Sequence, residues 1–581
     1  MPPANPGSPP FPSARWGPFL TDRARVAGWV WLAAAIYGLL VYACLPEGVA
    51  ALDDDFGYLR SVVATLQHGR PWTDDWLEPW AASFSSLSAL LYLITRNFYG
   101  ATYGLLPVLA AVSFGVAVLL LHDRGLKPWL AIVLAFSGLA FPTVFWKTIQ
   151  YTGLALYLPC LLGAIWACER RRWSVFLIAW LAALATRQSA LAWGMLPLVI
   201  AAGNWRAGIG HRAGRAFWRL ALVATAGAVV FVILWSAMNR THAQAVLGGR
   251  VFARVSLTHV LQIGMRGLGV YFVMAGIGLL VLRLNRPGFA GSRSWRSPAV
   301  RTVLALAAVV ICSFDLRTLV LWEHGATSGP AGWLLLKFLV LAGAAGWLFR
   351  GGALRPAMAA GALAALALLC SRGAVWDYYF FDLAALGLFG VRLRDETVAV
   401  PAPSEGRWRL AAGLVLAIAV VVNGLLILDF KAAMDRGWAV CRLGEQALRE
   451  GRLAPAELSF APFGFRAWHL YPWYVRHEGR DSADIAGFDC YLRPGAIEVG
   501  QGYSRLLHVL PRFCHEPPAD RRNLIAAGGT RFLWFFRGEY YLLRFKTEAE
   551  APPVARLPPD YCLQPFPLNE AEWSETVSAP N

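Results

Sequence analysis

The feature that most constrains the fold is a series of apolar runs, each of roughly 20 residues, separated by short loops. A run of this length forms a helix that spans a hydrocarbon core about 30 Å thick. Only 15% of the 581 residues are charged, against about 25% in soluble proteins, and 57% are hydrophobic. We therefore expect a polytopic α-helical membrane protein. The clearest runs are residues 26–46, 103–121, 151–168, 217–238, 263–282, 300–321, 333–349, 356–370 and 410–428.

The basic residues predict an orientation for these helices. The chain has a net charge of +17, and its arginines are concentrated in short loops between the apolar runs. Loops rich in Lys and Arg stay on the cytoplasmic side of a membrane, and they do not form the continuous stripe that binds nucleic acid. We therefore expect no nucleic-acid partner. The basic loops are residues 124–127, 169–172, 206–219, 283–301, 350–355 and 392–409.

This orientation divides the chain into three parts. Residues 1–25 are a cytoplasmic tail without a cleavable apolar core, residues 26–430 are a transmembrane domain, and residues 47–102 are its first outside loop. The basic loops all face inward only if residues 84–95 do not cross, and if residues 173–202 make two short crossings that meet at 186–188. The total is then about thirteen spans, with element ends uncertain by a few residues.

Residues 431–581 predict a soluble α+β domain on the outside. Charged and turn residues return here, and no later apolar run is long enough to span a membrane. Residues 531–536 and 540–545 predict a β-hairpin that turns at 537–539. Four cysteines in this part form either two disulfides in an oxidising compartment or free, buried thiols. These are Cys441, Cys490, Cys514 and Cys562.

The first outside loop contains three consecutive acids, Asp53, Asp54 and Asp55, followed by Asp74 and Asp75. Clustered carboxylates repel one another, and this favours binding of a proton or a divalent cation. Alternatively, they cap an amphipathic helix over residues 57–67, because Asp is preferred at the positive N-terminal end of a helix.

Arg187 interrupts a long apolar stretch on the same predicted side of the membrane. An ionisable residue in such a stretch is a functional candidate, and arginine can hold a phosphate through two hydrogen bonds. Alternatively, its side chain reaches out to the membrane surface. Lys147 is a second candidate of this kind. Arg240 and His242 lie in an outside loop that is unusually basic, and they favour an anionic ligand or a lipid headgroup there.

Several short segments resemble one family. The acids continue into DDFGY (54–58), HGR (68–70) and WTDDW (72–76). This arrangement resembles the GT-C superfamily of polyprenyl-phosphate-dependent glycosyltransferases, in the branch of protein mannosyltransferases, lipid A aminoarabinose transferases and rhizobial lipopolysaccharide core transferases. Further similar segments are residues 181–188 (LAALATRQ), 429–439 and 463–469, and residues 376–380 (WDYYF) look like a degenerate aromatic-Asp-Arg-Tyr segment.

The resemblance implies an inverting sugar transfer at the outer face of a bacterial inner membrane, with the C-terminal domain in the periplasm. The donor would be a sugar on a polyprenyl phosphate, and the acceptor would be a glycan, a lipid or a protein. Asp54 and Asp55, with Asp53 in support, would take the carboxylate role. The donor phosphate would contact Arg187 and Lys147, with Arg240 and His242 nearby. Candidates for contacts with the substrates are Tyr58, Asp74, Asp75, Gln150 and Asp377.

The chain departs from this family in one respect. Many members have a second acid in the next outside loop, whereas the loop here reads KTIQYTG (147–153). A divalent cation is therefore not favoured as a cofactor, and we expect no metal site. Two other classes stay open: a transporter or lipid-handling protein without covalent chemistry, and a non-catalytic member of an envelope complex.

Overall fold

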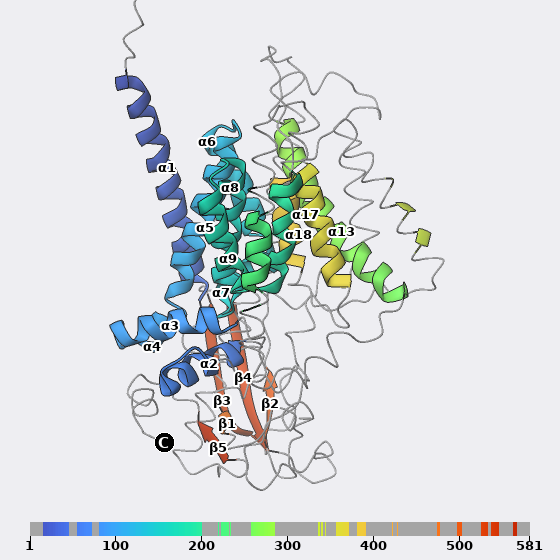
Figure 1. Cartoon of the computed structure of the whole chain (residues 1–581). Helices are drawn as coiled ribbons and strands as arrows, with labels where there is room; N and C mark the ends of the chain where they lie inside the picture. Colours follow the sequence, from blue (N-terminus) through green and yellow to red (C-terminus); the bar gives the residue numbers. More distant parts are fainter. Residues whose placement is uncertain are drawn as a thin grey trace, which may run out of the picture.

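A computed structural model of the whole chain is shown in Figure 1. It describes residues 16–45, 55–72, 81–199, 222–231, 257–284, 356–370 and 380–390, a few single positions between these, and five strands between 473 and 565. The described part is mainly a bundle of α-helices, with the strands beyond one end of the bundle (Figure 1). The predicted helical class is therefore confirmed.

Most helices lie along the bundle. Their bounds are α1 Trp16–Ala43, α5 Leu105–Asp123, α6 Pro128–Leu139, α7 Pro142–Ile149, α8 Leu154–Glu169, α9 Trp173–Leu184, α13 Leu257–Leu284, α17 Pro356–Cys370 and α18 Phe381–Phe389. One helical segment, Phe98–Asp123, is long and apolar enough to cross a bilayer by length and composition. The other apolar helical segments within the described ranges, some of them parts of longer helices, have 10–17 residues.

Helix α1 packs against α5 through small residues. A Cβ on Gly38 would lie 3.0 Å from the carbonyl oxygen of Pro107, so the two backbones approach closely there. Close approach at small residues is how apolar helices associate where water supplies no driving force. Tyr37 stabilises the same contact, because its ring stacks on Phe114 at 4.7 Å and its hydroxyl donates a 2.9 Å hydrogen bond to the carbonyl of Leu139.

Three helices lie across the bundle rather than along it. Helices α2 (Asp55–His68), α3 (Ala81–Thr95) and α4 (Phe98–Ala101) cover the end of the bundle nearest the strands (Figure 1). The predicted helix over 57–67 is thus present, and it begins two residues earlier at Asp55. Helix α3 lies across the bundle, and Leu93 and Ile94 near its end are exposed.

The chain leaves helical geometry after α9. Arg187 is extended (φ −159°, ψ 134°), and the 3₁₀ helix η1 (Gln188–Gly194) follows it. The break predicted at 186–188 is therefore present. Trp180 fixes it, because its indole N–H donates a 2.6 Å hydrogen bond to the carbonyl of Ala190 and its ring lies against Gly194.

A cluster of charged side chains joins three helix ends at the opposite end of the bundle. The guanidinium of Arg124 pairs with Glu169 at the end of α8 and donates a 2.6 Å hydrogen bond to the carbonyl of Phe389 at the end of α18. Its side chain is only 3% exposed. Nearby, Arg170 pairs with Asp123, but its side chain is 50% exposed.

We expect Arg124→Ala to lower the free energy of unfolding by about 3 kcal/mol, because it leaves the Glu169 carboxylate and a backbone carbonyl without their buried partner. Arg170→Ala is the matched control and should cost less than about 1 kcal/mol, since an exposed ion pair contributes little. Chemical denaturation of the two detergent-solubilised variants measures the difference. Equal losses would contradict the conclusion that the buried Arg124 guanidinium stabilises the contact among these three helix ends.

Large apolar side chains are exposed on the outside of the bundle. Trp31 on α1 is 66% exposed, and Leu39 on α1, Val108 on α5 and Ile178 on α9 are also exposed. Monomeric soluble proteins rarely expose contiguous apolar patches of this kind. The outer surface therefore fits contact with lipid better than contact with water.

The strands form two antiparallel sheets. Strands β1 (Trp473–Arg476) and β5 (Cys562–Pro565) pair with each other, and β2 (Ile497–Gln501), β4 (Phe536–Arg544) and β3 (Leu524–Phe532) form the order β2-β4-β3. The predicted hairpin exists, but the predicted turn at 537–539 is wrong. Gly538 pairs with Thr530 inside the ladder, and the connection is 533–535. The first strand begins at Leu524, seven residues before the predicted start at 531, and runs through Gly528 and Gly529.

Candidate functional site

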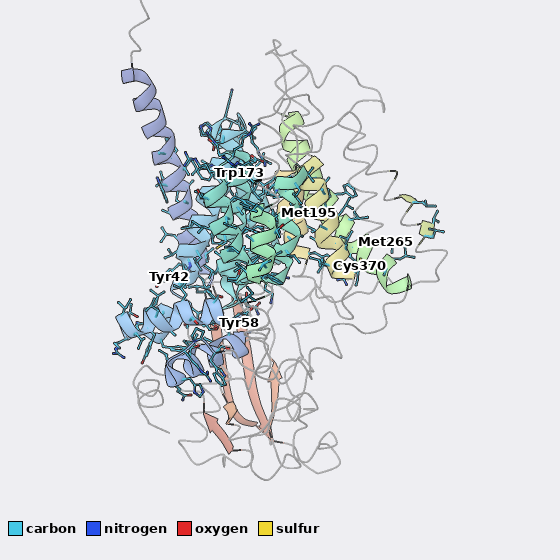
Figure 2. All side chains as sticks on the ribbon, in the orientation of Figure 1. Tyr42, Tyr58, Trp173, Met195, Met265 and Cys370 are labelled. Carbon is cyan, nitrogen blue, oxygen red and sulfur yellow. The ribbon has the colours of Figure 1, made fainter. Side chains whose placement is uncertain are left out.

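The first candidate segment is anchored by Tyr58 on α2. Its backbone carbonyl accepts a 3.3 Å hydrogen bond from Ser85 on α3, and its ring lies edge-on to Tyr151 at 6.4 Å. Its hydroxyl lies beside Gly153, where a Cβ would be 3.0 Å from the hydroxyl oxygen. A side chain at position 153 would push against this hydroxyl, so glycine there favours the close approach of α2 to the start of α8. Figure 2 shows Tyr58 where α2 meets the bundle, and Trp173 at the opposite end.

The second candidate segment is the connection between α7 and α8. Lys147 is only 5% exposed, and its ammonium donates a 2.5 Å hydrogen bond to the side-chain carbonyl of Gln150. A Cβ atom on Gly153 would also lie 3.5 Å from the carbonyl oxygen of Thr186. Tyr58, the 147–153 segment and the 186–188 break therefore meet at one end of the bundle, although they are far apart in the sequence.

Arg187 is positioned by the break between α9 and η1. Its guanidinium lies over the ring of Tyr157 on α8, 6.0 Å from the ring centroid. The Tyr157 hydroxyl in turn accepts a 3.3 Å hydrogen bond from Ser189. The half-buried guanidinium is thus held between two helices at the same end as Tyr58. An arginine placed in this way can pair with an anionic group.

Asp382 on α18 is a site residue that the sequence analysis did not single out. It is 1% exposed and follows Phe381, whose ring lies 6.2 Å from that of Tyr157. Arg187 acts electrostatically on its carboxylate, and the hydroxyls of Ser189 and Tyr157 lie nearby. Neither carboxylate oxygen nevertheless makes a hydrogen bond of acceptable geometry within the described part of the chain.

A signal for Asp382 was present in the sequence. It is an acid at the start of the apolar stretch 383–389, and an ionisable residue in such a setting is a functional candidate by default. The sequence analysis predicted the neighbouring Asp377 as a site residue instead, because it lies in the more recognisable WDYYF segment. A second missed charge is Arg266 on α13, which is buried and lies 5.6 Å from the ring of Phe380.

Many predicted site residues cannot be compared with the structure. Asp55 is the first residue of α2, and only its backbone is described. Among the residues whose placement is described, no group of three or more His, Cys, Asp or Glu could hold a metal ion. Within the described residues Cys44, Cys160, Cys168 and Cys370 form no disulfide, and they are buried or half-buried. The predictions for Asp53, Asp54, Asp74, Asp75, Arg240, His242 and Asp377, and for the side chains of the four C-terminal cysteines, lie outside the described residues.

The sequence was compared with models of known protein families and with curated protein sequences, and neither comparison gave a match.

Proposed function

We propose that this protein is a membrane glycosyltransferase of the GT-C type, with about thirteen spans and an outer α+β domain at its C-terminus. It moves a sugar from a polyprenyl-phosphate donor to the hydroxyl of an envelope glycan, lipid or protein, on the outer face of a bacterial inner membrane. The single observation that carries the proposal is the meeting of α2, Lys147 with Gln150, and Arg187 at one end of the bundle.

The polarity of the bundle supports the proposed side of the membrane. The basic connections at 124–127 and 169–172 lie at one end, and the residues of the candidate site lie at the other, next to the strands (Figure 1). Basic connections favour the cytoplasm. A site at the far end then has no access to cytoplasmic nucleotides, and a lipid-linked sugar is the activated donor available there.

The reaction needs two kinds of group. The acceptor hydroxyl attacks the anomeric carbon, the bond from that carbon to the phosphate oxygen breaks, and the configuration inverts. The proton of the hydroxyl passes to a carboxylate of Asp54 or Asp55, which act as general bases. The phosphate leaves with the bonding electron pair, and Arg187 stabilises its growing negative charge.

The test is incubation of the full-length protein with radiolabelled polyprenyl-phosphate sugars and an envelope extract. We expect label to move from the lipid to an acceptor that resists extraction with the donor. Label that binds and elutes unchanged would replace the proposal by a lipid-handling role. Comparison of envelope glycans from cells with and without the protein, by mass spectrometry, would then identify both sugar and acceptor.

A further inference from the structure

The observation behind this inference is the backbone conformation of Arg96, which directly follows α3. Arg96 has a φ of 54°, and among the described residues only Arg171 is likewise a non-glycine residue with a positive φ. A helix usually ends on glycine in this conformation, because a side chain is strained there. Gly125, with a φ of 91°, takes this position after α5. An arginine kept where glycine would be easier calls for a reason that lies in its side chain.

The reason that applies to Arg171 does not apply to Arg96. Arg171 belongs to the basic connection 169–172, and positive charge is expected at that end of the bundle. Arg96 lies at the opposite end, where α3 covers the bundle and basic residues are not favoured (Figure 1). Its side chain is exposed, and no group in the described part of the chain pairs with its guanidinium. A partner outside the chain is therefore the simplest reason for this arginine.

The neighbouring segments place Arg96 at the edge of the apolar layer. The helical segment that is long and apolar enough to cross a bilayer begins at Phe98. The lipid headgroups, with their phosphates, occupy a layer of about 5–8 Å on each side of the hydrocarbon core. Tyr42 is exposed at the same end of the bundle, as is usual for tyrosine at the level of the headgroups (Figure 2). Arg96 therefore lies at the level of lipid phosphates.

The last turns of α3 carry an apolar surface beside this arginine. Leu90, Leu93 and Ile94 are exposed, and their spacing puts them on one side of the helix, which we call the apolar face of α3. On the other side Tyr92 is buried, and its ring lies edge-on to that of Phe98 at 5.9 Å. A helix with an exposed apolar face and a basic residue at its end has the character of a helix that lies in the membrane surface.

We propose that the end of α3 is a lipid-binding site. Arg96 binds the headgroup phosphate of an anionic phospholipid, and the apolar face of α3 enters the acyl layer beside it. A guanidinium binds two phosphate oxygens at once, and an anionic headgroup such as phosphatidylglycerol has no cation of its own to compete for its phosphate. The site fixes the depth of α3 in the membrane surface, and it does not depend on the proposed sugar transfer.

The test is photolabelling of the full-length protein in phosphatidylcholine vesicles that contain a trace of phosphatidylglycerol with a photoreactive acyl chain. Mass spectrometry of the digested protein identifies the labelled residues. We expect label on residues 90–94, and about fivefold less label there in Arg96→Gly, since one arginine near an anionic membrane surface has roughly this effect. A photoreactive phosphatidylcholine should label these residues equally in both proteins. The melting temperature of Arg96→Gly should equal or exceed that of the wild type, because glycine removes the backbone strain.

Three further variants separate the two parts of the site. Arg96→Lys keeps the charge and should retain most of the label from phosphatidylglycerol. Arg70→Ala removes another exposed arginine from the same end of the bundle, where its guanidinium lies over the ring of Trp72, and should leave labelling unchanged. Ile94→Asn changes only the apolar face, so label from both lipids should fall by a similar factor.

The outcomes decide between headgroup binding and an ordinary solvated arginine. Unchanged phosphatidylglycerol label in Arg96→Gly, at an equal or higher melting temperature, would overturn the proposal. An equal fall in label from both lipids in Arg96→Gly would also overturn it, because the headgroup would then make no difference. Absence of label on residues 90–94 from either lipid would show that another part of the protein covers this face. The transfer of labelled sugar is measured separately, so failure here leaves the proposed function untouched.

Discussion

Replacing Arg187 with alanine is expected to lower the rate of sugar transfer by about 10²–10³-fold, the usual cost of removing one group that stabilises charge in a transition state. The reason is positional. Arg187 lies over Tyr157 at the break between α9 and η1, at the end of the bundle where Tyr58 lies beside Gly153. A leaving phosphate at that end would otherwise develop its charge in a poorly solvated setting.

Two further variants make this prediction specific. Arg187→Lys keeps the charge but loses the planar fork that binds two phosphate oxygens, so we expect an intermediate loss of about tenfold. Arg171→Ala is the control, because it removes an exposed arginine from the opposite end of the bundle and should leave transfer unchanged. Initial rates of transfer from a labelled donor measure the effect of each of the three variants. Their melting temperatures should equal that of the wild type, so that a lower rate does not reflect unfolding. Transfer at the wild-type rate by the Arg187→Ala variant would show that Arg187 takes no part in the reaction.

The helical part of the fold could be predicted from the sequence because its signals are local. The apolar run 356–370 coincides with α17, and the run 103–121 differs from α5 by two residues at each end. The break at 186–188 was also readable, because a charged residue interrupts an apolar stretch. Length and charge fix these features without reference to the rest of the molecule.

The candidate site could be predicted only in part, because it depends on contacts between distant segments. Nothing in the local sequence shows that the Tyr58 hydroxyl lies beside Gly153, or that Tyr157 lies against both Arg187 and Phe381. The contact between Lys147 and Gln150 is a further feature that the sequence did not predict. Both were proposed as contacts with substrate, and the structure shows that they bind each other. The Lys147 ammonium has three N–H donors, so a substrate phosphate could bind it while the bond to Gln150 stays in place.

The second large effect is expected at the acids before α2. Asp54→Asn and Asp55→Asn should each lower transfer by about 10²–10⁴-fold, because an amide cannot accept the proton of the attacking hydroxyl. Asp55 begins α2, and Tyr58 lies one helical turn further along, against Gly153. The chain that carries the acids is thereby held at the end of the bundle to which Arg187 belongs. This is the geometry that a base and a phosphate-binding group must share.

The competing explanation is that these acids only cap α2, and the same variants distinguish the two. Asparagine caps a helix about as well as aspartate, so loss of capping would change stability by no more than a few tenths of a kcal/mol, roughly the difference among good capping residues. Capping alone therefore predicts nearly unchanged stability and unchanged transfer, whereas the general-base role predicts an unchanged melting temperature together with lost transfer. Asp123→Asn, at the far end of the bundle, should change neither quantity. Full transfer by both Asp54→Asn and Asp55→Asn would leave capping as the sufficient account, and the carboxylate of the reaction would then have to be sought elsewhere at this end of the bundle.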